Sequence, residues 1–295
     1  MSETGRYRGR FAPSPSGPLH FGSLVAAVGS YLDARSLKGD WLLRMEDIDP
    51  PREKPGAADA ILNTMELFGF EWDGPVLYQS SRIDAYREAA GYLTSQGLAY
   101  PCGCSRKQVE IAGSQGPEGM IYPGTCRNGT EITRDTKTLR VLTRSAEVSF
   151  PDLIHGRFRQ NLELDVGDFI VRRADGLYAY QLAVVVDDAF QNITRIVRGS
   201  DLLFSTPRQV YLQRLLGLPQ PEYSHLPLVM GEDGRKLSKQ SLAWPVESSD
   251  PLRSLLQAAG FLGQIPPVDA PCNLEEFWEW AITSWDNSSV PVQQF

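Results

Sequence analysis

The sequence predicts an α/β fold with a parallel sheet and helices on both faces. Strand patterns and helix patterns alternate over the first hundred residues with short connections, and such alternation favours right-handed crossovers into a parallel sheet. The alternation returns after residue 166, beyond a region of cysteines, glycines and β patterns. We therefore expect a core in two halves with an insert between them.

The first strand, loop and helix lie within residues 7–32. A β-prone run, 7–12, leads into a Pro/Ser/Gly turn, and an amphipathic helix begins near His20. The N–H groups and the positive dipole end of such a helix favour phosphate, and Gly22 lets a ligand approach the backbone closely. We expect His20 to lie beside a bound phosphate; the alternative is a helix-start histidine satisfied by its own loop.

The first half continues with strands, helices and an acidic cluster. The predicted elements are a strand over 41–46, a helix over 56–68, a strand over 76–78 and a helix over 81–96. The cluster Glu46-Asp47-Ile48-Asp49 ends the first of these strands. Carboxylates at the C-terminal end of a parallel strand face the ligand crevice, although a solvated acidic turn is the alternative.

The insert contains a candidate metal site. Cys102-Gly103-Cys104 precedes a stretch, 113–129, that lacks hydrophobic periodicity and contains the run Tyr122 to Cys126. Three thiolates on Zn²⁺ would order such a stretch, whereas unliganded buried thiols are the alternative. The fourth ligand is open among Tyr122, the distant Cys272 and water. Beyond it, β patterns over 139–164 predict an inserted antiparallel unit.

The second half carries a lysine-rich loop. Its predicted elements are a strand over 168–173, a helix over 178–190, a strand over 194–198, a helix over 207–216 and a strand near 226–230. Lys236-Leu237-Ser238-Lys239-Gln240 follows a Gly-rich turn and could clamp phosphates, although a solvated loop is the alternative.

Only 55 residues follow Gln240. There Asp250 and Asn273 are expected to cap two further helices, the first with Pro251 as its first residue.

Composition narrows the class of protein. The chain has 295 residues, 42% of them hydrophobic, enough for an ordinary buried core. Its net charge of −7 argues against broad non-specific nucleic-acid binding without excluding a local basic patch. No signal-peptide or membrane-span pattern is present, and four cysteines, three of them clustered, fit a metal site in a reducing compartment. We expect a cytoplasmic protein without a membrane partner, and a monomer, because nothing in the sequence indicates a dedicated interface.

Two motifs at the ends of the α/β pattern resemble a known family. Pro18-Leu19-His20-Phe21-Gly22-Ser23 and Lys236-Leu237-Ser238-Lys239-Gln240 resemble the HIGH and KMSKS signatures of class I aminoacyl-tRNA synthetases. Arg10 to Gly17 and Arg44 to Asp49 are similar to the glutamyl branch. The Cys-x-Cys insert and the short tail narrow the match to stand-alone paralogues of the glutamyl-tRNA synthetase catalytic core.

The motifs depart from the family pattern at three positions. Ser23 replaces the second histidine, and Leu237 and Gln240 replace the Met and the last Ser of KMSKS. Glutamyl-branch enzymes tolerate these changes, so adenylation remains the expectation.

The resemblance implies a Rossmann-type catalytic core in four segments. Residues 1–100 would form its first half, and 101–165 a zinc-binding and acceptor-end-type insert. Residues 166–245 would form the second half with the KMSKS-like loop, and 246–295 a short helical region without an anticodon-binding domain.

The resemblance also implies a reaction and its partners. ATP would activate L-glutamate without tRNA, and the glutamyl group would pass to the cyclopentene diol of queuosine at the wobble position of tRNA(Asp). The implied glutamate pocket comprises Arg10, Phe11, Ala12, Pro13, Ser14, Glu46, Tyr180 and Arg198. ATP, with Mg²⁺, would be bound by His20, Gly22, Lys236, Ser238 and Lys239, of which His20 and Lys239 are the catalytic candidates. One Zn²⁺ would be held by Cys102, Cys104, Tyr122 and Cys126.

The charges of the implied pocket match glutamate. A substrate with two carboxylates and one ammonium needs fixed guanidinium donors and one carboxylate, and Arg10, Arg198 and Glu46 supply that pattern. Arg198 could instead pair with Asp201. Two other functions remain open: a truncated glutamyl-tRNA synthetase that charges a tRNA 3′ end, and a non-catalytic paralogue that binds glutamate or ATP.

Overall fold

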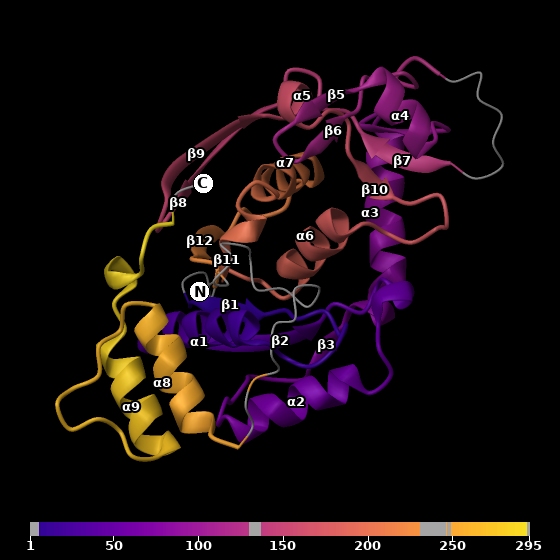
Figure 1. Cartoon of the computed structure of the whole chain (residues 1–295). Coiled ribbons are helices and arrows are strands. Elements are labelled where there is room, and N and C mark those ends of the chain that lie inside the picture. The colour runs from indigo at the N-terminus through magenta and orange to yellow at the C-terminus, as the bar shows by residue number, and fades with distance from the viewer. Residues whose placement is uncertain (1–5, 130–136, 231–245, 247–248, 294–295) are drawn as a thin grey trace, which may run out of the picture.

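The predicted parallel sheet lies at the centre of the computed structural model, which describes residues 6–129, 137–230, 246 and 249–293 (Figure 1). Its strands are β1 (Arg8–Phe11), β2 (Asp40–Met45), β3 (Leu77–Tyr78), β11 (Arg195–Gly199), β12 (Glu222–Leu226) and β8 (Glu147–Asp152). β1, β2 and β3 pair in parallel, as do β11, β12 and β8. The amide of Thr194 donates to the carbonyl of Arg8 at 2.9 Å, which joins the two groups. The C-terminal ends of β1, β2 and β11 therefore meet at one edge.

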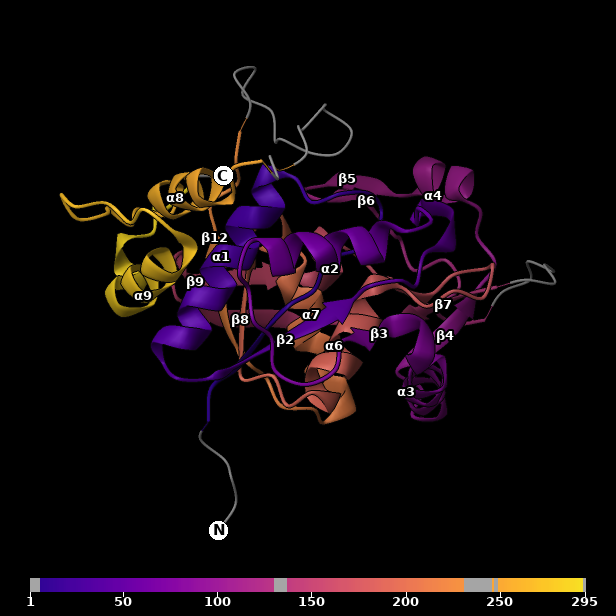
Figure 2. The ribbon, with the colours of Figure 1, turned by 90° about the horizontal axis from the view of Figure 1, so that it is seen from below.

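Helices cover both faces of this sheet, as predicted (Figure 2). One face carries α1 (Phe21–Ser36) and α2 (Ala57–Leu67). The other carries α3 (Ile83–Ser95), α6 (Tyr180–Phe190) and α7 (Thr206–Leu216). Each lies within a few residues of its predicted range, because apolar periodicity and the flanking Gly and Pro residues are local signals.

The antiparallel unit predicted over 139–164 is confirmed in part: the strands pair antiparallel, but they belong to two different sheets. β7 (Thr138–Val141) pairs with β4 (Ala99–Cys102) and β10 (Ile170–Arg172) in a separate antiparallel sheet. β8 instead joins the main sheet beside β12, and β9 (Gly156–Asn161) pairs with β8. A two-residue alternation marks a strand but does not identify its partner, so the sequence pattern could not divide these strands between two sheets.

The stretch without periodicity is short secondary structure around the cysteines. It follows α4 (Arg106–Ala112), which begins with a capping box formed by Ser105 and Gln108. The hairpin of β5 (Ser114–Gly116) and β6 (Gly119–Ile121) comes next, and α5 (Leu162–Asp165) follows β9. These elements lie at the opposite end of the molecule from α8 and α9 (Figure 1).

The C-terminal helices are part of the main core. α8 (Pro251–Phe261) and α9 (Leu274–Ser284) pack against α1. Asp250 and Asn273 cap them as predicted, each accepting a hydrogen bond from a first-turn amide. The strand expected near 226–230 lies earlier, as β12, because Pro227 has no N–H with which to extend the ladder. None of the helices in the described part of the chain is long and apolar enough to cross a membrane.

Candidate active site

A cavity of about 720 Å³ opens at the C-terminal ends of β1, β2 and β11. Ten residues singled out from the sequence line it, from four separate segments of the chain. They are Arg10, Phe11, Ala12, Pro13, Ser14, His20, Gly22, Glu46, Tyr180 and Arg198. The other predicted ATP ligands, Lys236, Ser238 and Lys239, lie outside the described residues. The fold thus brings together, in one place, every described residue predicted for glutamate or ATP.

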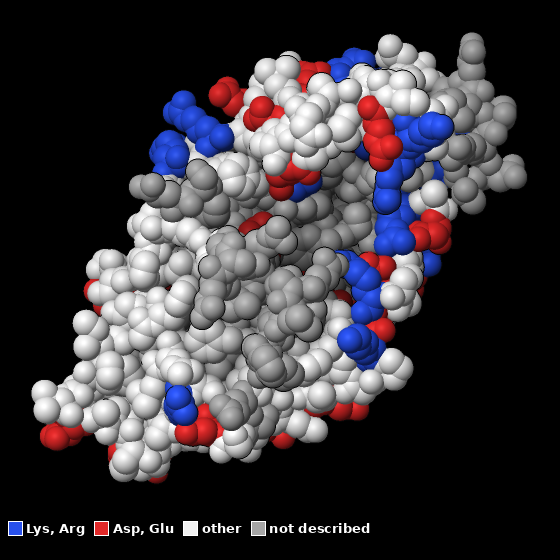
Figure 3. Space-filling view, in the orientation of Figure 1, with Lys and Arg blue, Asp and Glu red and all other residues white. Residues whose placement is uncertain are grey.

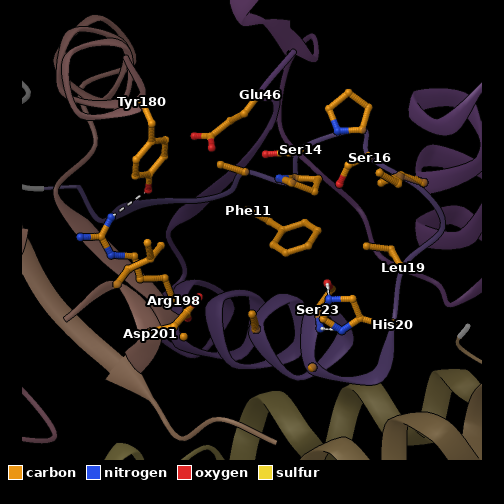
Figure 4. Close-up of a pocket in the computed structure, with 18 of the residues that line it drawn as sticks. Phe11, Ser14, Ser16, Leu19, His20, Ser23, Glu46, Tyr180, Arg198 and Asp201 are labelled. Atoms are coloured by element: carbon orange, nitrogen blue, oxygen red, sulfur yellow. Dashed lines mark hydrogen bonds between the residues drawn. The ribbon is translucent and has the colours of Figure 1, made fainter. Parts of the chain in front are cut away.

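The cavity has two chemically different ends (Figure 4). Tyr180, Glu46 and Arg198 surround one end, and His20 lies at the other, beside the start of α1. Phe11 lies between them. One end offers fixed charges for a small zwitterion, and the other offers a helix N-terminus suited to phosphate.

Arg198 is held in place by neutral groups. Its Nε donates to His225, one terminal nitrogen donates to Tyr180 at 3.3 Å, and the other donates to Thr206 at 2.8 Å and to Gln209 at 2.7 Å. Arg198 is itself 6% exposed. Because these hydrogen bonds leave its positive charge in place, the cavity presents a buried, rigid guanidinium suited to a carboxylate.

Glu46 provides the opposite charge. Its amide donates to the carbonyl of Pro13, which places it directly after β2 and against the loop after β1. Its Oε1 is buried and has no hydrogen-bond partner among the described residues; the nearest guanidinium nitrogen, of Arg44, is 3.6 Å away. Burial raises the pKa of Glu46 to about 7, although Arg44 and Arg10 oppose the rise. An unpaired buried oxygen of this kind is suited to an ammonium group.

Arg10 belongs to a buried charge network. Its Nε donates to Asp188 at 2.9 Å, and Arg44 donates to the same oxygen of Asp188 at 2.8 Å and to Gln191 at 2.7 Å. Burial opposes ionisation of Asp188, but the two guanidinium groups outweigh it and hold its pKa below the usual range. The shared carboxylate fixes Arg10 in the wall of the cavity and Arg44 behind it.

His20 caps α1. Its Nδ1 accepts from the amide of Ser23 at 3.2 Å, and its Nε2 lies 3.1 Å from the hydroxyl of Ser23. In a neutral ring the proton is then on Nε2, which donates to that hydroxyl. The contact predicted as the alternative is therefore present, and His20 also lines the cavity. Both features hold at once.

The cysteines of the insert form a second candidate site. The sulfur atoms of Cys102, Cys104 and Cys126 lie within 4.8 Å of one another. The Tyr122 hydroxyl lies 3.3 Å from Cys102 Sγ and 3.6 Å from Cys104 Sγ. Cys272 is elsewhere, at the start of α9, where its thiol contacts Glu276. The three thiols could hold a metal ion, and Tyr122 lies where a fourth ligand would be.

The geometry of this cluster fits a tetrahedral metal. Zn–S bonds of about 2.3 Å in a tetrahedron place the sulfurs about 3.8 Å apart, and Cys104 Sγ and Cys126 Sγ are 3.6 Å apart. Burial raises the pKa of the Cys104 thiol to about 11. A bound cation would reverse that effect by stabilising the thiolate.

Sequence reasoning did not single out the groups that support the cavity. Arg44, Asp188, Asp152 and His225 are buried, and none was assigned a role from the pattern. One signal was available: Arg44 interrupts an apolar strand, and Asp188 follows the apolar run of α6. A charged residue in a buried element requires a partner, but the sequence does not say which one.

The surface charge is uneven. In the orientation of Figure 3, Lys and Arg side chains gather along the edge that carries α4 and β10, beside the hollow of the molecule. The net charge of the chain is nevertheless −7. This edge is the kind of local basic patch that the composition left open.

Comparison with known proteins identifies the family. Residues 6–256 match the family described as tRNA synthetases class I (E and Q), catalytic domain. The chain is 54% identical, over 97% of its length and 96% of the relative, to a glutamyl-Q tRNA(Asp) synthetase of Dechloromonas aromatica. A protein of the same name from Chromobacterium violaceum is 53% identical over the same shares.

A solved structure extends the comparison to the fold. A glutamate tRNA ligase from Elizabethkingia meningosepticum, in complex with its amino acid, matches with a TM-score of 0.79 and 25% identity. The match covers 97% of this chain and 66% of that one. The chain therefore belongs to the class I tRNA synthetases of the E and Q type and, within them, to the glutamyl-Q tRNA(Asp) synthetases.

Proposed function

We propose that this protein activates L-glutamate with ATP, without tRNA, and transfers the glutamyl group to the queuosine cyclopentene diol at the wobble position of tRNA(Asp). Two buried charged groups in one cavity carry the proposal. One is the guanidinium of Arg198, which neutral groups hold in place, and the other is a carboxylate oxygen of Glu46 that has no hydrogen-bond partner among the described residues. The names of the relatives supply the acceptor.

Glutamate recognition follows from the charges. Glu46 would bind the α-ammonium, and Arg198 and Arg10 would bind carboxylates, with the Tyr180 hydroxyl as a neutral donor beside Arg198. Ser14, with Phe11, Ala12 and Pro13, would form the wall between the two ends of the cavity. Arg10, Glu46 and Arg198 lie at or next to strand ends and Tyr180 at a helix start, so little ordering of these groups is required when the substrate binds.

Activation requires positioning more than acid–base chemistry. A carboxylate oxygen of glutamate attacks the α-phosphorus of ATP, and the bond to the leaving pyrophosphate oxygen breaks. His20 and the N-terminus of α1, approached closely at Gly22, would stabilise charge on the phosphate oxygens from one side. Lys239, with Lys236 and Ser238, would do so from the other. Mg²⁺ accompanies ATP and neutralises its phosphates.

The transfer step exchanges one acyl bond for another. A hydroxyl of the queuosine diol attacks the carbonyl carbon of the glutamyl adenylate, an ester forms, and AMP leaves with the electron pair of the broken bond. The basic edge in Figure 3 supports an RNA partner, because phosphate contacts require Lys and Arg. We place the reaction in the cytoplasm, where ATP and tRNA are available, and assign it to a monomer.

The metal of the insert is proposed to be one Zn²⁺, with Cys102, Cys104 and Cys126 as thiolate ligands and Tyr122 as the fourth. Zinc would there order a stretch that has little apolar core of its own. Its role in this proposal is structural.

The test is a two-stage assay. Glutamate-dependent exchange of pyrophosphate into ATP is measured without tRNA, with L-glutamine and L-aspartate as comparisons, and we expect exchange with glutamate alone. Labelled glutamate is then offered to tRNA(Asp) with and without queuosine, and nuclease fragments locate the label. Label in the anticodon fragment of the queuosine-containing tRNA only is the expected result.

The alternative functions give different results in the same assay. A truncated glutamyl-tRNA synthetase would label both tRNAs in the fragment that carries the 3′ end. A glutamate- or ATP-binding paralogue would give no exchange at all. Either result would overturn the proposal.

A further inference from the structure

A chain of buried polar side chains leads from Arg198 away from the cavity. Arg198 Nε donates to His225 Nε2 at 3.1 Å, and His225 Nδ1 lies 2.6 Å from Asp152 Oδ2. The side chains of His225 and Asp152 are fully buried, and neither residue is among those that line the cavity. Three neighbouring strands, β11, β12 and β8, supply the three residues.

Arg198 fixes the proton positions in this row of hydrogen-bonded side chains, Arg198, His225 and Asp152, which we call the proton chain. A guanidinium Nε always carries its hydrogen, so His225 Nε2 must be the acceptor and the ring proton must lie on Nδ1. That proton is donated to Asp152. Burial lowers the pKa of His225 to about 4 despite its contact with Asp152, so the ring is neutral, and its acceptor lone pair faces Arg198.

Asp152 is in turn held as a carboxylate. Its Oδ1 accepts from the amides of Ile154 and His155 at 3.0 and 2.9 Å. Burial favours the neutral acid, but the hydrogen bonds from His225 and from these amides outweigh it and hold the pKa of Asp152 below its usual range. An ionised Asp152 can only accept a hydrogen bond from Nδ1. The neutral ring of His225 must therefore carry its proton on Nδ1.

Among the residues that the structure describes, Arg198 keeps its charge and one donor hydrogen without a hydrogen-bond partner. Four of its five donor hydrogens are used by the neutral partners Tyr180, Thr206, Gln209 and His225. The negative charge that balances it, on Asp152, lies one imidazole ring away. A carboxylate in direct contact with Arg198 would compete with the carboxylate of the substrate. Asp152 orients the guanidinium through His225 and leaves one of its N–H groups for the substrate.

We propose that Asp152 and His225 are positioning residues for glutamate recognition. Asp152 fixes the Nδ1-protonated form of His225, and His225 holds Arg198 so that its remaining N–H, together with the Tyr180 hydroxyl, faces the carboxylate of bound glutamate. This inference rests on the proposed function, because it takes glutamate as the ligand of Arg198.

Two variants test the chain. In Asp152→Asn the amide can donate to Nδ1 and move the ring proton to Nε2, where it opposes the Arg198 N–H. His225→Phe removes the acceptor and keeps a ring. Pyrophosphate exchange should show the KM for glutamate raised about tenfold to a hundredfold in both variants, the loss expected for an unsatisfied buried charged donor. The KM for ATP should change less than about twofold.

Tyr223→Phe is the matched control. Tyr223 lies on the same strand as His225, is equally buried, and loses a hydrogen bond to Gln213 when its hydroxyl is removed. The variant keeps the ring, and with it the stacking on His225 and the contact with the Arg198 guanidinium. The hydroxyl that it removes contacts Gln213 and takes no part in the proton chain, so the KM for glutamate should stay at the wild-type value. A glutamate KM that is unchanged in the two test variants, or that rises together with the KM for ATP, would overturn the inference.

A measurement on the wild-type protein separates this inference from the proposed function. With ¹⁵N-labelled histidine, NMR distinguishes protonated from bare ring nitrogens, and His225→Phe assigns the signal among three histidines. We expect His225 with a protonated Nδ1 and a bare Nε2 between pH 6 and 8. A protonated Nε2 refutes the proton chain, whatever KM values the variants show. Absence of glutamate-dependent exchange would instead refute the proposed function, whatever the tautomer.

Discussion

At the scale of single residues, burial decides what each charge of the cavity can do. Glu46 and Arg198 are both inside the protein, but Arg198 has neutral partners and Glu46 has an oxygen without a hydrogen-bond partner among the described residues. Desolvation raises the pKa of Glu46 to about 7, so the empty cavity holds it near the midpoint of its titration at neutral pH. A bound ammonium would favour the ionised form.

Glutamate binding should therefore depend on pH through Glu46. Because the substrate ammonium requires the carboxylate, the KM for glutamate should fall as pH rises through about 7 and then level off. Glu46→Gln should raise this KM by about tenfold or more and abolish the inflection. Pyrophosphate exchange between pH 6 and 8.5 measures both. An inflection that persists in Glu46→Gln would assign it to another group.

The same shift has a consequence for stability with the opposite sign. A carboxyl group whose folded pKa is raised, from 4.5 to about 7, stabilises the fold below its unfolded pKa and loses that contribution as pH rises through 7. Glu46→Gln should therefore be more stable than wild type at pH 8, by up to on the order of 3 kcal/mol. At pH 4 the two should be alike. Urea unfolding at the two pH values makes the comparison.

His20 should contribute to rate rather than to glutamate affinity. His20→Ala is expected to lower kcat for pyrophosphate exchange about a hundredfold, because the side chain proposed to stabilise charge on the phosphate oxygens is lost, while the KM for glutamate stays near wild type. Loss of the helix cap costs about 1 kcal/mol, which a thermal melt would register. Ser23→Ala keeps the imidazole and should cost less than about tenfold. Equal losses in the two variants would mean that His20 acts only through its contact with the Ser23 hydroxyl.

At the scale of elements, the metal cluster depends on a close backbone approach. Gly167, at φ +71°, forms a bridge with Tyr122, and a Cβ at this position would lie 2.6 Å from the Tyr122 amide nitrogen. Arg127, next to Cys126, forms an ion pair with Asp168 through two hydrogen bonds of 2.6 and 2.9 Å. The loop that carries the third cysteine is thereby tied to the residues just before β10.

Metal content tests the cluster directly. We expect one zinc per chain by elemental analysis, lost in Cys104→Ser and accompanied by a lower melting temperature, since structural zinc contributes to folding. Cys272→Ser, which changes an exposed cysteine outside the cluster, should keep the wild-type zinc content and the wild-type melting temperature. A purified protein that lacks metal and still has the wild-type melting temperature would contradict the zinc assignment.

At the scale of the whole molecule, the C-terminal helices complete the core. Trp278 of α9 packs edge-to-face on Tyr31 of α1 and on Phe70, and its indole N–H donates to the carbonyl of Phe68. Phe277 is fully buried in the same cluster. α1, which begins at the cavity, is therefore covered on its outer side by residues from the other end of the described chain.

Removing one of these side chains should weaken the whole protein. Phe277→Ala should lower the free energy of unfolding by about 3–5 kcal/mol, the cost of a large core cavity. Ile265→Ala, at a position that is 86% exposed, should change it by less than about 0.5 kcal/mol. Urea unfolding followed by tryptophan fluorescence measures both. A separate early transition for Phe277→Ala would show that α8 and α9 unfold on their own.

The local structure and most of the residues that line the cavity were predictable from the sequence. Local structure depends on residues that are close in sequence, so hydrophobic periodicity and capping residues predict it. Examples are the caps Asp250 and Asn273, and the strand, loop and helix around His20. The residues of the cavity came from motif resemblance, and those within the described chain do line one cavity.

Contacts between residues far apart in the sequence become visible only in the folded structure. The partner of β8, the sharing of Asp188 by Arg10 and Arg44, and the chain from Asp152 through His225 to Arg198 all join residues far apart in sequence. The alternation of apolar and polar residues predicts a strand but does not predict which strand it pairs with. A charged residue in a buried element requires a counterion, but the sequence does not identify it. These pairings are settled when the sheets and helices pack, which is why the residues that hold the cavity in shape could not be read from the sequence.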